Sequence, residues 1–232
     1  MDALILAAGY GSRIRGISGS KPLTPVAGVP LIELAIRSAT LAGAQRVVVT
    51  TGWRGQQVEA ELAGIAERTG IAIEAHRIAD FDRANGFSVR AGAARIDGDY
   101  LLMMADHIFS PRILGALCRE GRADCGVTLA IDRRVHSPLV DPDDATWVSL
   151  NEDGRIRRIG KSLKSYDAVD CGAFLATAEL SEAIGAAIAA GLPGSLSDGM
   201  QTLADAGRAR VMDIGEEWWI DVEDPAAHAQ AE

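Results

Sequence analysis

The N-terminal stretch Met1–Arg13, MDALILAAGYGSR, decides the fold class. It contains a short apolar run, Ala3–Leu6, which is followed by Gly9 and Gly11. An apolar run of this length that ends in glycines is typical of a buried strand entering a tight turn. We therefore expect the chain to open with a central strand and a glycine-containing loop.

The residues that follow alternate between helix and strand patterns. Apolar residues between Leu31 and Ala42 have helical spacing, and Arg46–Thr51 (RVVVTT) is β-branched like a buried strand. A second helix pattern covers Val58–Ala66, and Ile71–Glu74 alternates like a strand. This β-α-β-α-β order predicts a mostly parallel sheet covered by helices, with ligands at the carboxyl ends of its strands.

A further unit continues the alternation. We expect a helix over Asn85–Arg95, a strand over Tyr100–Met104, and a helix that begins at Ser110-Pro111 and runs through Leu117. Asp106 and His107 then lie at the carboxyl end of a strand.

The organisation changes after Asp124. The turn signal Asp153-Gly154 predicts a hairpin. Expected strands cover residues 126–131, 146–150, 155–159, 168–175, 209–213 and 218–222, and an Ala-rich helix covers 179–190. The sequence predicts one Rossmann-like three-layer α/β/α domain over residues 1–232, with a mostly parallel mixed sheet and a β-hairpin elaboration in its second half.

Composition and charge exclude several classes of protein. The chain has 232 residues, 48% apolar and 24% charged, which is ordinary globular usage and not that of a disordered or fibrous protein. It carries 23 basic and 32 acidic residues, a net charge of −9. Nucleic acid is therefore not an expected partner, because its binding depends on phosphate neutralisation by Lys and Arg. A small anion in a local pocket remains compatible with this charge.

Neither a membrane span nor a disulfide framework is predicted. No segment approaches roughly 18 consecutive apolar residues, and the N-terminus lacks the basic region of a signal peptide. Cys118, Cys125 and Cys171 form no C-x-x-C pair, which indicates buried thiols. We expect a cytoplasmic protein that does not itself span a membrane.

The strongest local motif is Leu6–Arg13 followed by Lys21-Pro22-Leu23. Glycines after a first strand let backbone N–H groups approach a phosphate chain, and Arg13 and Lys21 add positive charge. The pattern fits neither G-x-G-x-x-G nor a P-loop. A plain strand-to-helix turn with surface cations is the alternative, and the two cations favour phosphate binding over it.

A second signal is a pair of aspartates that are distant in sequence. Asp106 follows the predicted strand Tyr100–Met104, and Asp221 lies in the predicted strand Trp218–Val222. Magnesium bound with a nucleotide is typically held by one or two carboxylates plus substrate phosphates. Each aspartate alone is explained by a solvated strand end, whereas the pair beside a phosphate loop predicts a Mg²⁺ site.

Other polar residues are ambiguous. Lys161 can hold a phosphate, and Asp167 and Asp170 can accept hydrogen bonds from sugar-like hydroxyls, although solvated lysines and strand-flanking aspartates are common. Asn85-Gly86 can be a helix cap or a loop that contacts a base. His107 can act as an acid or base, but the four histidines have no metal-binding spacing.

At these motifs the sequence resembles the sugar-phosphate nucleotidyltransferases, and within them it is most similar to the CTP:inositol-1-phosphate cytidylyltransferases. The resemblance extends from Met1 to about Pro225. Besides Leu6–Arg13 and Lys21–Leu23, it is carried by Asn85–Ser88, Met104–His107, Asp132–Arg134, Asp141–Thr146 and Tyr166–Gly172.

The resemblance implies a GT-A-like fold and a role for each motif. It implies a nucleotide-binding half, residues 1–124, and an acceptor-binding half, residues 125–232. Arg13 and Lys21 are the expected catalytic cations on the nucleotide phosphates, and Asp106 and Asp221 the expected Mg²⁺ ligands. Lys161 is expected to bind the acceptor phosphate, with Asp167 and Asp170 at the polyol. The nucleotide itself is expected to contact Leu6, Ala8, Gly9, Gly11, Asn85, Gly86 and Ser88.

The reaction implied by the resemblance is a direct displacement. A phosphate oxygen of the acceptor attacks the α-phosphorus of CTP and pyrophosphate leaves, so catalysis consists of positioning and charge stabilisation. No strong general base is required, and no catalytic role is expected for His107. The expected substrates are a nucleoside triphosphate and a polyol or sugar phosphate.

Alternatives remain open within this resemblance. One is transfer to a sugar 1-phosphate from UTP, dTTP or GTP, another is a phosphocholine cytidylyltransferase, and a third is a catalytically silent nucleotide-binding protein. Many inositol-phosphate relatives are fused to a membrane transferase that consumes the product. No membrane segment is predicted in this sequence, so we expect the consuming enzyme to be a separate protein. A homodimer is compatible with the resemblance, but the sequence carries no signal for it.

Overall fold

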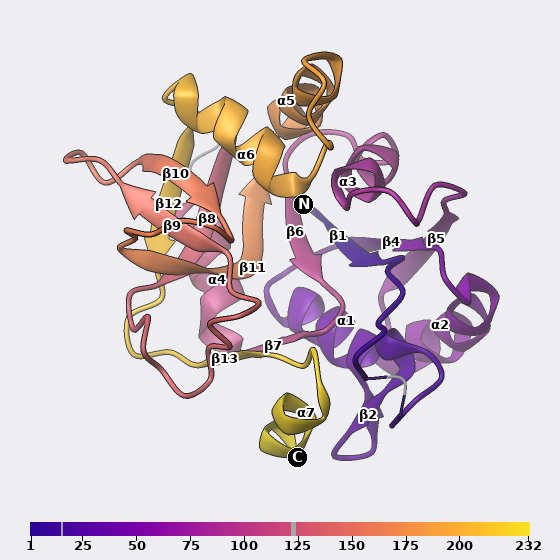
Figure 1. The fold of residues 1–232 in the computed structure, drawn as a ribbon. Coiled ribbons are helices and arrows are strands. Elements are labelled where there is room, and N and C mark those ends of the chain that lie inside the picture. Colours follow the sequence, from indigo (N-terminus) through magenta and orange to yellow (C-terminus); the bar gives the residue numbers. More distant parts are fainter. Residues whose placement is uncertain (15, 122–123) are drawn as a thin grey trace.

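The structure is a computed structural model that describes residues 1–14, 16–121 and 124–232. Across these residues a nine-stranded sheet forms the centre of the molecule (Figure 1). Four strands in the order β6-β1-β4-β5 are parallel, and their ranges are β1 Asp2–Ala7, β4 Arg46–Thr51, β5 Ala72–Arg77 and β6 Tyr100–Met104. Their carboxyl ends share one edge, as the alternating sequence predicts.

The second half extends this sheet with antiparallel strands. The long strand β11 (Ala168–Ala176) pairs antiparallel with β6, β8 and β9, and β12 runs parallel to β8. The hairpin β9–β10 forms the edge of the sheet beyond β11. The remaining ranges are β8 Val127–Asp132, β9 Trp147–Leu150, β10 Ile156–Gly160 and β12 Ala209–Asp213.

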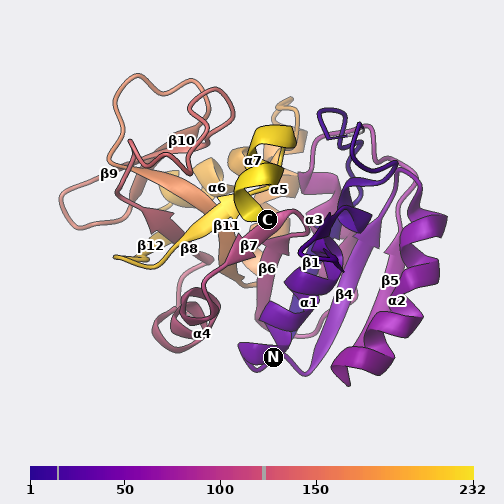
Figure 2. The ribbon, with the colours of Figure 1, turned by 90° about the horizontal axis from the view of Figure 1, so that it is seen from below.

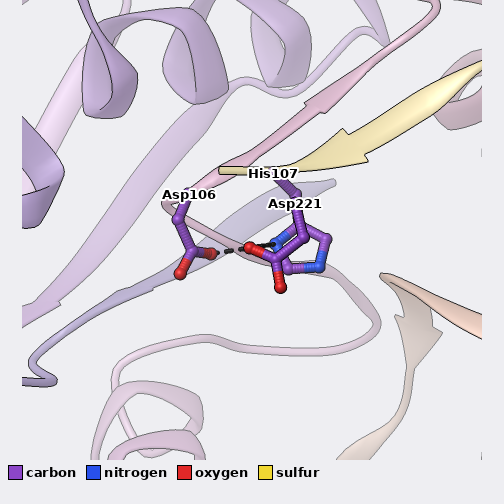
Figure 3. A group of neighbouring side chains, drawn as sticks. All are labelled: Asp106, His107 and Asp221. Atoms are coloured by element: carbon purple, nitrogen blue, oxygen red, sulfur yellow. Dashed lines mark hydrogen bonds and ion pairs between the residues drawn. The ribbon is translucent and has the colours of Figure 1, made fainter. Parts of the chain in front are cut away.

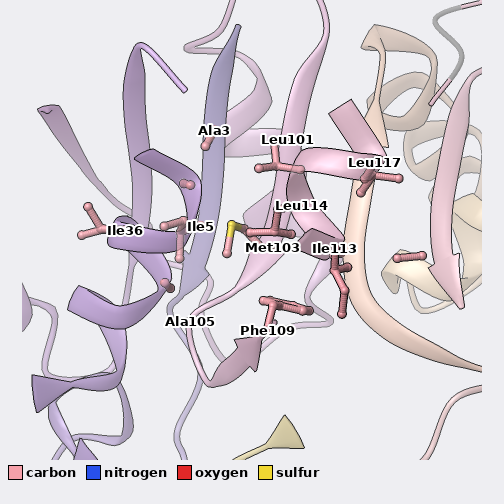
Figure 4. Close-up of a cluster of buried hydrophobic side chains, with 14 of the residues drawn as sticks. Ala3, Ile5, Ile36, Leu101, Met103, Ala105, Phe109, Ile113, Leu114 and Leu117 are labelled. Carbon is pink, nitrogen blue, oxygen red and sulfur yellow. The ribbon is translucent and has the colours of Figure 1, made fainter. Parts of the chain in front are cut away.

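Helices cover both faces of the sheet, and β1 is therefore buried on both sides. Ala3, Ile5 and Ala7 face α1 (Leu31–Leu41), α2 (Gly55–Thr69) and α4 (Pro111–Glu120), as Figure 4 shows for part of this cluster. Leu4 and Leu6 belong to the cluster on the opposite face. That face is covered by α3 Gly86–Ala93, α5 Ala178–Ala189 and α6 Leu196–Asp205.

Short elements surround the carboxyl ends of the parallel strands. β7 (His107–Phe109) pairs antiparallel with β13 (Trp219–Asp221), so that Asp221 lies opposite His107. The others are η1 Lys21–Leu23, β2 Pro25–Val26, β3 Val29–Pro30 and α7 Pro225–Ala231. Figure 2 shows the β9–β10 side and the α2–β5 side at opposite ends of the molecule, with α7 between them.

The predicted fold class is confirmed, and the strand ranges Tyr100–Met104 and Ala209–Asp213 are observed as predicted. Among the described residues, six elements go beyond the prediction: η1, β2, β3, β7, α6 and α7. Ser195 and Asp198 form a capping box that could have located helix α6. Strand β7 has only three residues, which are too few for a periodic pattern. In the part of the chain that the structure describes, no helix is both long and apolar enough to cross a membrane.

Candidate active site

The loop after β1 is shaped by contact with Lys21. Gly11 has φ +55°, and a Cβ placed on it would collide with the Cβ of Lys21. Only glycine adopts this backbone without strain, and only glycine leaves room for the lysine stem. Gly9 and Ala8 line a cavity at the carboxyl ends of the strands, as does Leu6. The loop therefore presents Lys21 and its own backbone to the same space.

The ammonium group of Lys21 is surrounded by a carboxylate cluster, which we define as Asp106, Asp221 and Glu223. Lys21 Nζ forms ion pairs with Asp106 and Glu223 and lies 3.9 Å from Asp221 Oδ1. Its side chain is only 8% exposed. Burial by itself lowers the pKa of Lys21, but the three carboxylates outweigh it and raise the pKa well above its ordinary value. Lys21 is thus a buried permanent cation.

His107 lies beside Asp106 and Asp221 of this cluster (Figure 3). Its Nδ1 lies 2.9 Å from Asp106 Oδ1 and 3.7 Å from Asp221 Oδ1. The ring stacks on Trp219 with centroids 5.7 Å apart and on Phe109 at 6.0 Å. Burial lowers the pKa of His107, but the charges of Asp221 and Asp106 raise it to about 9. The imidazole is therefore protonated at neutral pH and donates to Asp106.

The two predicted metal ligands are brought together by the β7–β13 pairing. Asp106 precedes β7 and Asp221 ends β13. The Oδ1 atom of Asp221 is buried and accepts no hydrogen bond from the described residues. Burial raises the pKa of Asp221 to about 6, whereas the charges of Lys21 and His107 hold that of Asp106 well below its usual range, against its burial. A buried carboxylate oxygen without a donor fits a divalent cation, which prefers oxygen ligands.

Two further cations that are distant in sequence, Arg13 and Lys161, meet at Asp144. Arg13 Nη2 lies 2.8 Å and Lys161 Nζ 2.7 Å from the same Asp144 Oδ1. Arg13 also lies 3.6 Å from Glu223 Oε1. The hydrogen bond from Arg13 to Asp144 and the negative charge of Asp144 raise the pKa of Arg13 above its ordinary value. The structure thereby places the predicted nucleotide-phosphate cation next to the predicted acceptor-phosphate cation.

A cavity of about 750 Å³ lies next to these charges. Asp106, Asp221, Lys161 and Asp170 line it, together with the loop Pro138–Thr146. A second cavity of about 210 Å³ lies beside it, between the Gly9–Gly11 loop, Lys21 and Glu223. A space of this size at the carboxyl ends of parallel strands is the expected place for a small-molecule site in an α/β fold.

The predicted base-contacting residues have different surroundings. Asn85 and Ser88 line the large cavity, but Asn85 Oδ1 accepts a hydrogen bond from Leu196 N at 2.8 Å and so anchors α6. A Cβ on Gly86 would collide with Gly194 O, so Gly86 serves close packing of α3 and is not among the cavity-lining residues. Their contact with a nucleotide stays a prediction.

The two predicted polyol-contacting aspartates also differ. Asp170 lines the large cavity, and burial raises its pKa to about 6 although its Oδ1 accepts a hydrogen bond from Gly172 N at 2.7 Å. Asp167 instead accepts a hydrogen bond from Leu150 N at 2.7 Å and ties β9 to β11, away from the cavity lining. Asp170 is therefore better placed for a substrate than Asp167.

Two site residues were not singled out from the sequence for these roles. Glu223 contacts both Lys21 and Arg13, and Asp144 contacts both Arg13 and Lys161. Both are carboxylates that hold predicted phosphate-binding cations. Glu223 follows Asp221 by two residues, and this spacing is the one local signal for it.

Comparison with known proteins extends these findings. The chain is 34% identical over 228 residues to a protein of Rubrobacter xylanophilus named bifunctional IPC transferase and DIPP synthase, covering 97% of this chain and 50% of that protein. It is 32% identical over 253 residues to the CMP-5'-(3-aminopropyl)phosphonate synthase of Streptomyces rubellomurinus, covering 99% of this chain and 38% of that protein. The chain thus spans about half the length, or less, of these curated relatives.

The same fold is found in a solved structure, the inositol-1-phosphate CTP transferase from T. maritima. The two agree with a TM-score of 0.82 at 24% sequence identity, over 97% of this chain and 90% of that one. The family model of the MobA-like NTP transferase domain matches residues 3–169, most of the chain. The chain belongs to the family of MobA-like NTP transferase domains, and the predicted membership among the nucleotidyltransferases is confirmed.

Proposed function

We propose that this protein transfers the cytidylyl group of CTP to inositol 1-phosphate or a similar polyol phosphate. An oxygen of the acceptor phosphate attacks the α-phosphorus, the bond to the bridging oxygen breaks, and pyrophosphate leaves with those electrons. The names of the relatives from Rubrobacter xylanophilus and T. maritima support the choice of substrates.

The observation that carries the proposal is the meeting of Arg13 and Lys161 at one oxygen of Asp144. A direct transfer requires two phosphate-bearing substrates, both anionic, to approach within bonding distance. Two cations that share one carboxylate oxygen supply positive charge to both sides of such a contact. Substrate phosphates would replace Asp144 as their partner, which is charge stabilisation by positioned groups.

Lys21 and the carboxylate cluster complete the proposed machinery. Lys21 neutralises charge on the nucleotide phosphates, and His107 holds Asp106 in place through its Nδ1–H. Asp106 and Asp221 would hold Mg²⁺, which supplies charge neutralisation for the phosphates when bound. The nucleotide contacts would come from Leu6, Ala8, Gly9 and Gly11, with Asn85, Gly86 and Ser88 at the base. On the acceptor side, Asp170 in the cavity lining and Asp167 just before β11 would contact the polyol.

A phosphonate acceptor is the second candidate. The Streptomyces rubellomurinus relative aligns with 99% of this chain, and its name describes a CMP-phosphonate product. A phosphonate oxygen is an anionic nucleophile like that of a phosphate monoester, so the same cations would serve it. The acceptor, and not the transfer chemistry, distinguishes the two candidates.

The test is pyrophosphate release measured over a panel of triphosphates and acceptors. We expect release only with CTP, inositol 1-phosphate and Mg²⁺ together. Release with 2-aminoethylphosphonate in place of inositol 1-phosphate would favour the second candidate. Release with glucose 1-phosphate and UTP or dTTP, but none with CTP, would contradict the cytidylyl assignment. No release under any combination would support a silent nucleotide-binding protein.

The cellular setting follows from these substrates. Reduced cysteines and CTP are both typical of the cytoplasm, which stays the predicted location. A membrane transferase is the class of enzyme that we expect to consume the product.

A further inference from the structure

Lys21 holds the oxygens that a divalent cation would need. Its ammonium group pairs with Asp106 Oδ2 and with Glu223, and lies 3.9 Å from Asp221 Oδ1, which accepts no hydrogen bond from the described residues. Two of these three carboxylates are the proposed Mg²⁺ ligands. A lysine ammonium and a divalent cation repel each other, so both cannot occupy the centre of the carboxylate cluster at once.

Both oxygens of Asp106 already have a partner. Oδ1 accepts from His107 and Oδ2 pairs with Lys21. A divalent cation that binds Asp106 would therefore share an oxygen with one of these two cationic donors and would repel it.

His107 is the donor that cannot leave. Its ring stacks on Trp219 and on Phe109. It also packs directly on Gly172, where a Cβ would collide with the imidazole at 2.5 Å from Cδ2. Lys21 in contrast has a flexible four-carbon stem that carries a point charge. The displaced donor is therefore Lys21.

The structure provides a place for the displaced ammonium group. The cavity of about 210 Å³ is bordered by Lys21 itself, by Gly9 and Gly11 of the loop after β1, and by Asp106. This is where backbone N–H groups of the loop are expected to meet the nucleotide phosphates. A phosphate there offers Lys21 an anionic partner in exchange for the carboxylates.

We propose that Lys21 is a stand-in cation, which neutralises the carboxylate cluster in the substrate-free protein and moves to the nucleotide phosphates when a divalent cation takes its place. The inference rests on the proposed function for the identity of both ligands. Lys21 then has two successive positions, one at the carboxylate cluster and one at the nucleotide phosphates. In the first position it competes with the divalent cation for Asp106 and Asp221.

The test is Mn²⁺ binding without nucleotide, measured from the electron paramagnetic resonance signal of free Mn²⁺. We compare wild type with Lys21→Met and with the matched control Lys161→Met. The control removes the same charge from a lysine that lines the neighbouring large cavity, and Lys161 contacts Asp144 and not Asp106 or Asp221. We expect Lys21→Met to bind Mn²⁺ on the order of tenfold more tightly than wild type, and the control to stay within about threefold.

The same variants yield a second readout. We expect Mn²⁺ to raise the Tm of Lys21→Met more than that of wild type, because the metal restores the missing positive charge. Should Lys21→Met not fold, Lys21→Gln, which keeps a hydrogen-bond donor for Glu223, carries the same expectation.

The outcomes separate this inference from the proposed function. Mn²⁺ binding that is no tighter in Lys21→Met than in Lys161→Met overturns the stand-in role, even if the wild type is an active cytidylyltransferase. Tighter binding in Lys21→Met supports it, even if another triphosphate proves to be the substrate. Absence of Mn²⁺ binding in all three proteins overturns both the stand-in role and the metal site.

Discussion

The two ends of the parallel sheet carry similar charged residues in opposite arrangements. At the amino ends of the strands, Arg46 donates to Asp2, to Glu74 and to the carbonyl oxygen of Arg95, and Arg95 donates to Glu74. We call Asp2, Arg46, Glu74 and Arg95 the amino-end network. At the carboxyl ends, Lys21 lies among three carboxylates, one of which has a buried oxygen without a hydrogen-bond donor in the described residues.

The difference indicates which end is built for a ligand. Arg46 in the amino-end network is 33% exposed, and its guanidinium donates to Asp2, to Glu74 and to the carbonyl oxygen of Arg95. The charges of this network are therefore paired with one another and partly solvated. At the carboxyl ends Lys21 is only 8% exposed, and burial raises the pKa of both Asp170 and Asp221 to about 6. Carboxylates held at a cost in stability, with an unused oxygen, are characteristic of functional sites.

The largest effect should follow loss of the metal ligands. We expect Asp106→Asn and Asp221→Asn each to lower turnover on the order of 1000-fold, because the charge that holds Mg²⁺ is removed. Pyrophosphate release at saturating CTP measures it, and EDTA should abolish the wild-type rate. Asp2→Asn in the amino-end network is the matched control and should keep its rate. Full rates in both site variants would rule out this metal site.

Lys21→Ala should have the next largest effect, with a loss of turnover on the order of 100-fold. This is the scale of removing one charge donor to the transition state. Arg46→Ala removes a cation from the other end of the sheet and is the control. Turnover in Lys21→Ala that matches wild type would exclude Lys21 from phosphate binding.

Asp170→Asn should stabilise the protein at neutral pH. The pKa of Asp170 is about 6 in the folded protein against 3.8 ordinarily, so its stability contribution is full below about pH 4 and is lost as pH rises through 6. Asparagine does not titrate and can still accept from Gly172 N. We expect a gain of roughly 1 to 3 kcal/mol at pH 7 and little difference at pH 4.

Urea unfolding at the two pH values measures the Asp170→Asn effect. An equal difference at both would show that the Asp170 charge does not oppose folding. If Asp170 also contacts the acceptor, the same variant should raise the KM for inositol 1-phosphate more than it lowers kcat.

Arg46→Met should have the smallest effect. The amino-end network is partly exposed, so losing its central cation should cost about 1 kcal/mol of unfolding free energy and leave turnover within about twofold. Urea unfolding and pyrophosphate release measure the two quantities. A large loss of turnover in Arg46→Met would break the proposed division between the two ends of the sheet.

The sequence by itself determined the fold and the list of charged candidates. The alternation of apolar runs with helical spacing predicts the parallel strands, since burial on both faces leaves a local pattern. The glycines of the loop after β1 are equally local, because a turn with positive φ needs Gly11 at that position. Arg13, Lys21, Asp106 and Asp221 could be proposed because each follows or lies in such a pattern.

Only the tertiary structure decided which candidates meet. The β7–β13 pairing that places Asp221 opposite His107 joins residues more than a hundred positions apart, and the three-residue strand β7 has no periodicity to reveal it. Asp144 and Glu223 became site residues through contacts with distant cations, and Asp167 proved to hold β9 to β11. The physical reason is that burial and charge pairing depend on the whole fold, whereas a sequence pattern reports only the few residues that share one strand, helix or turn.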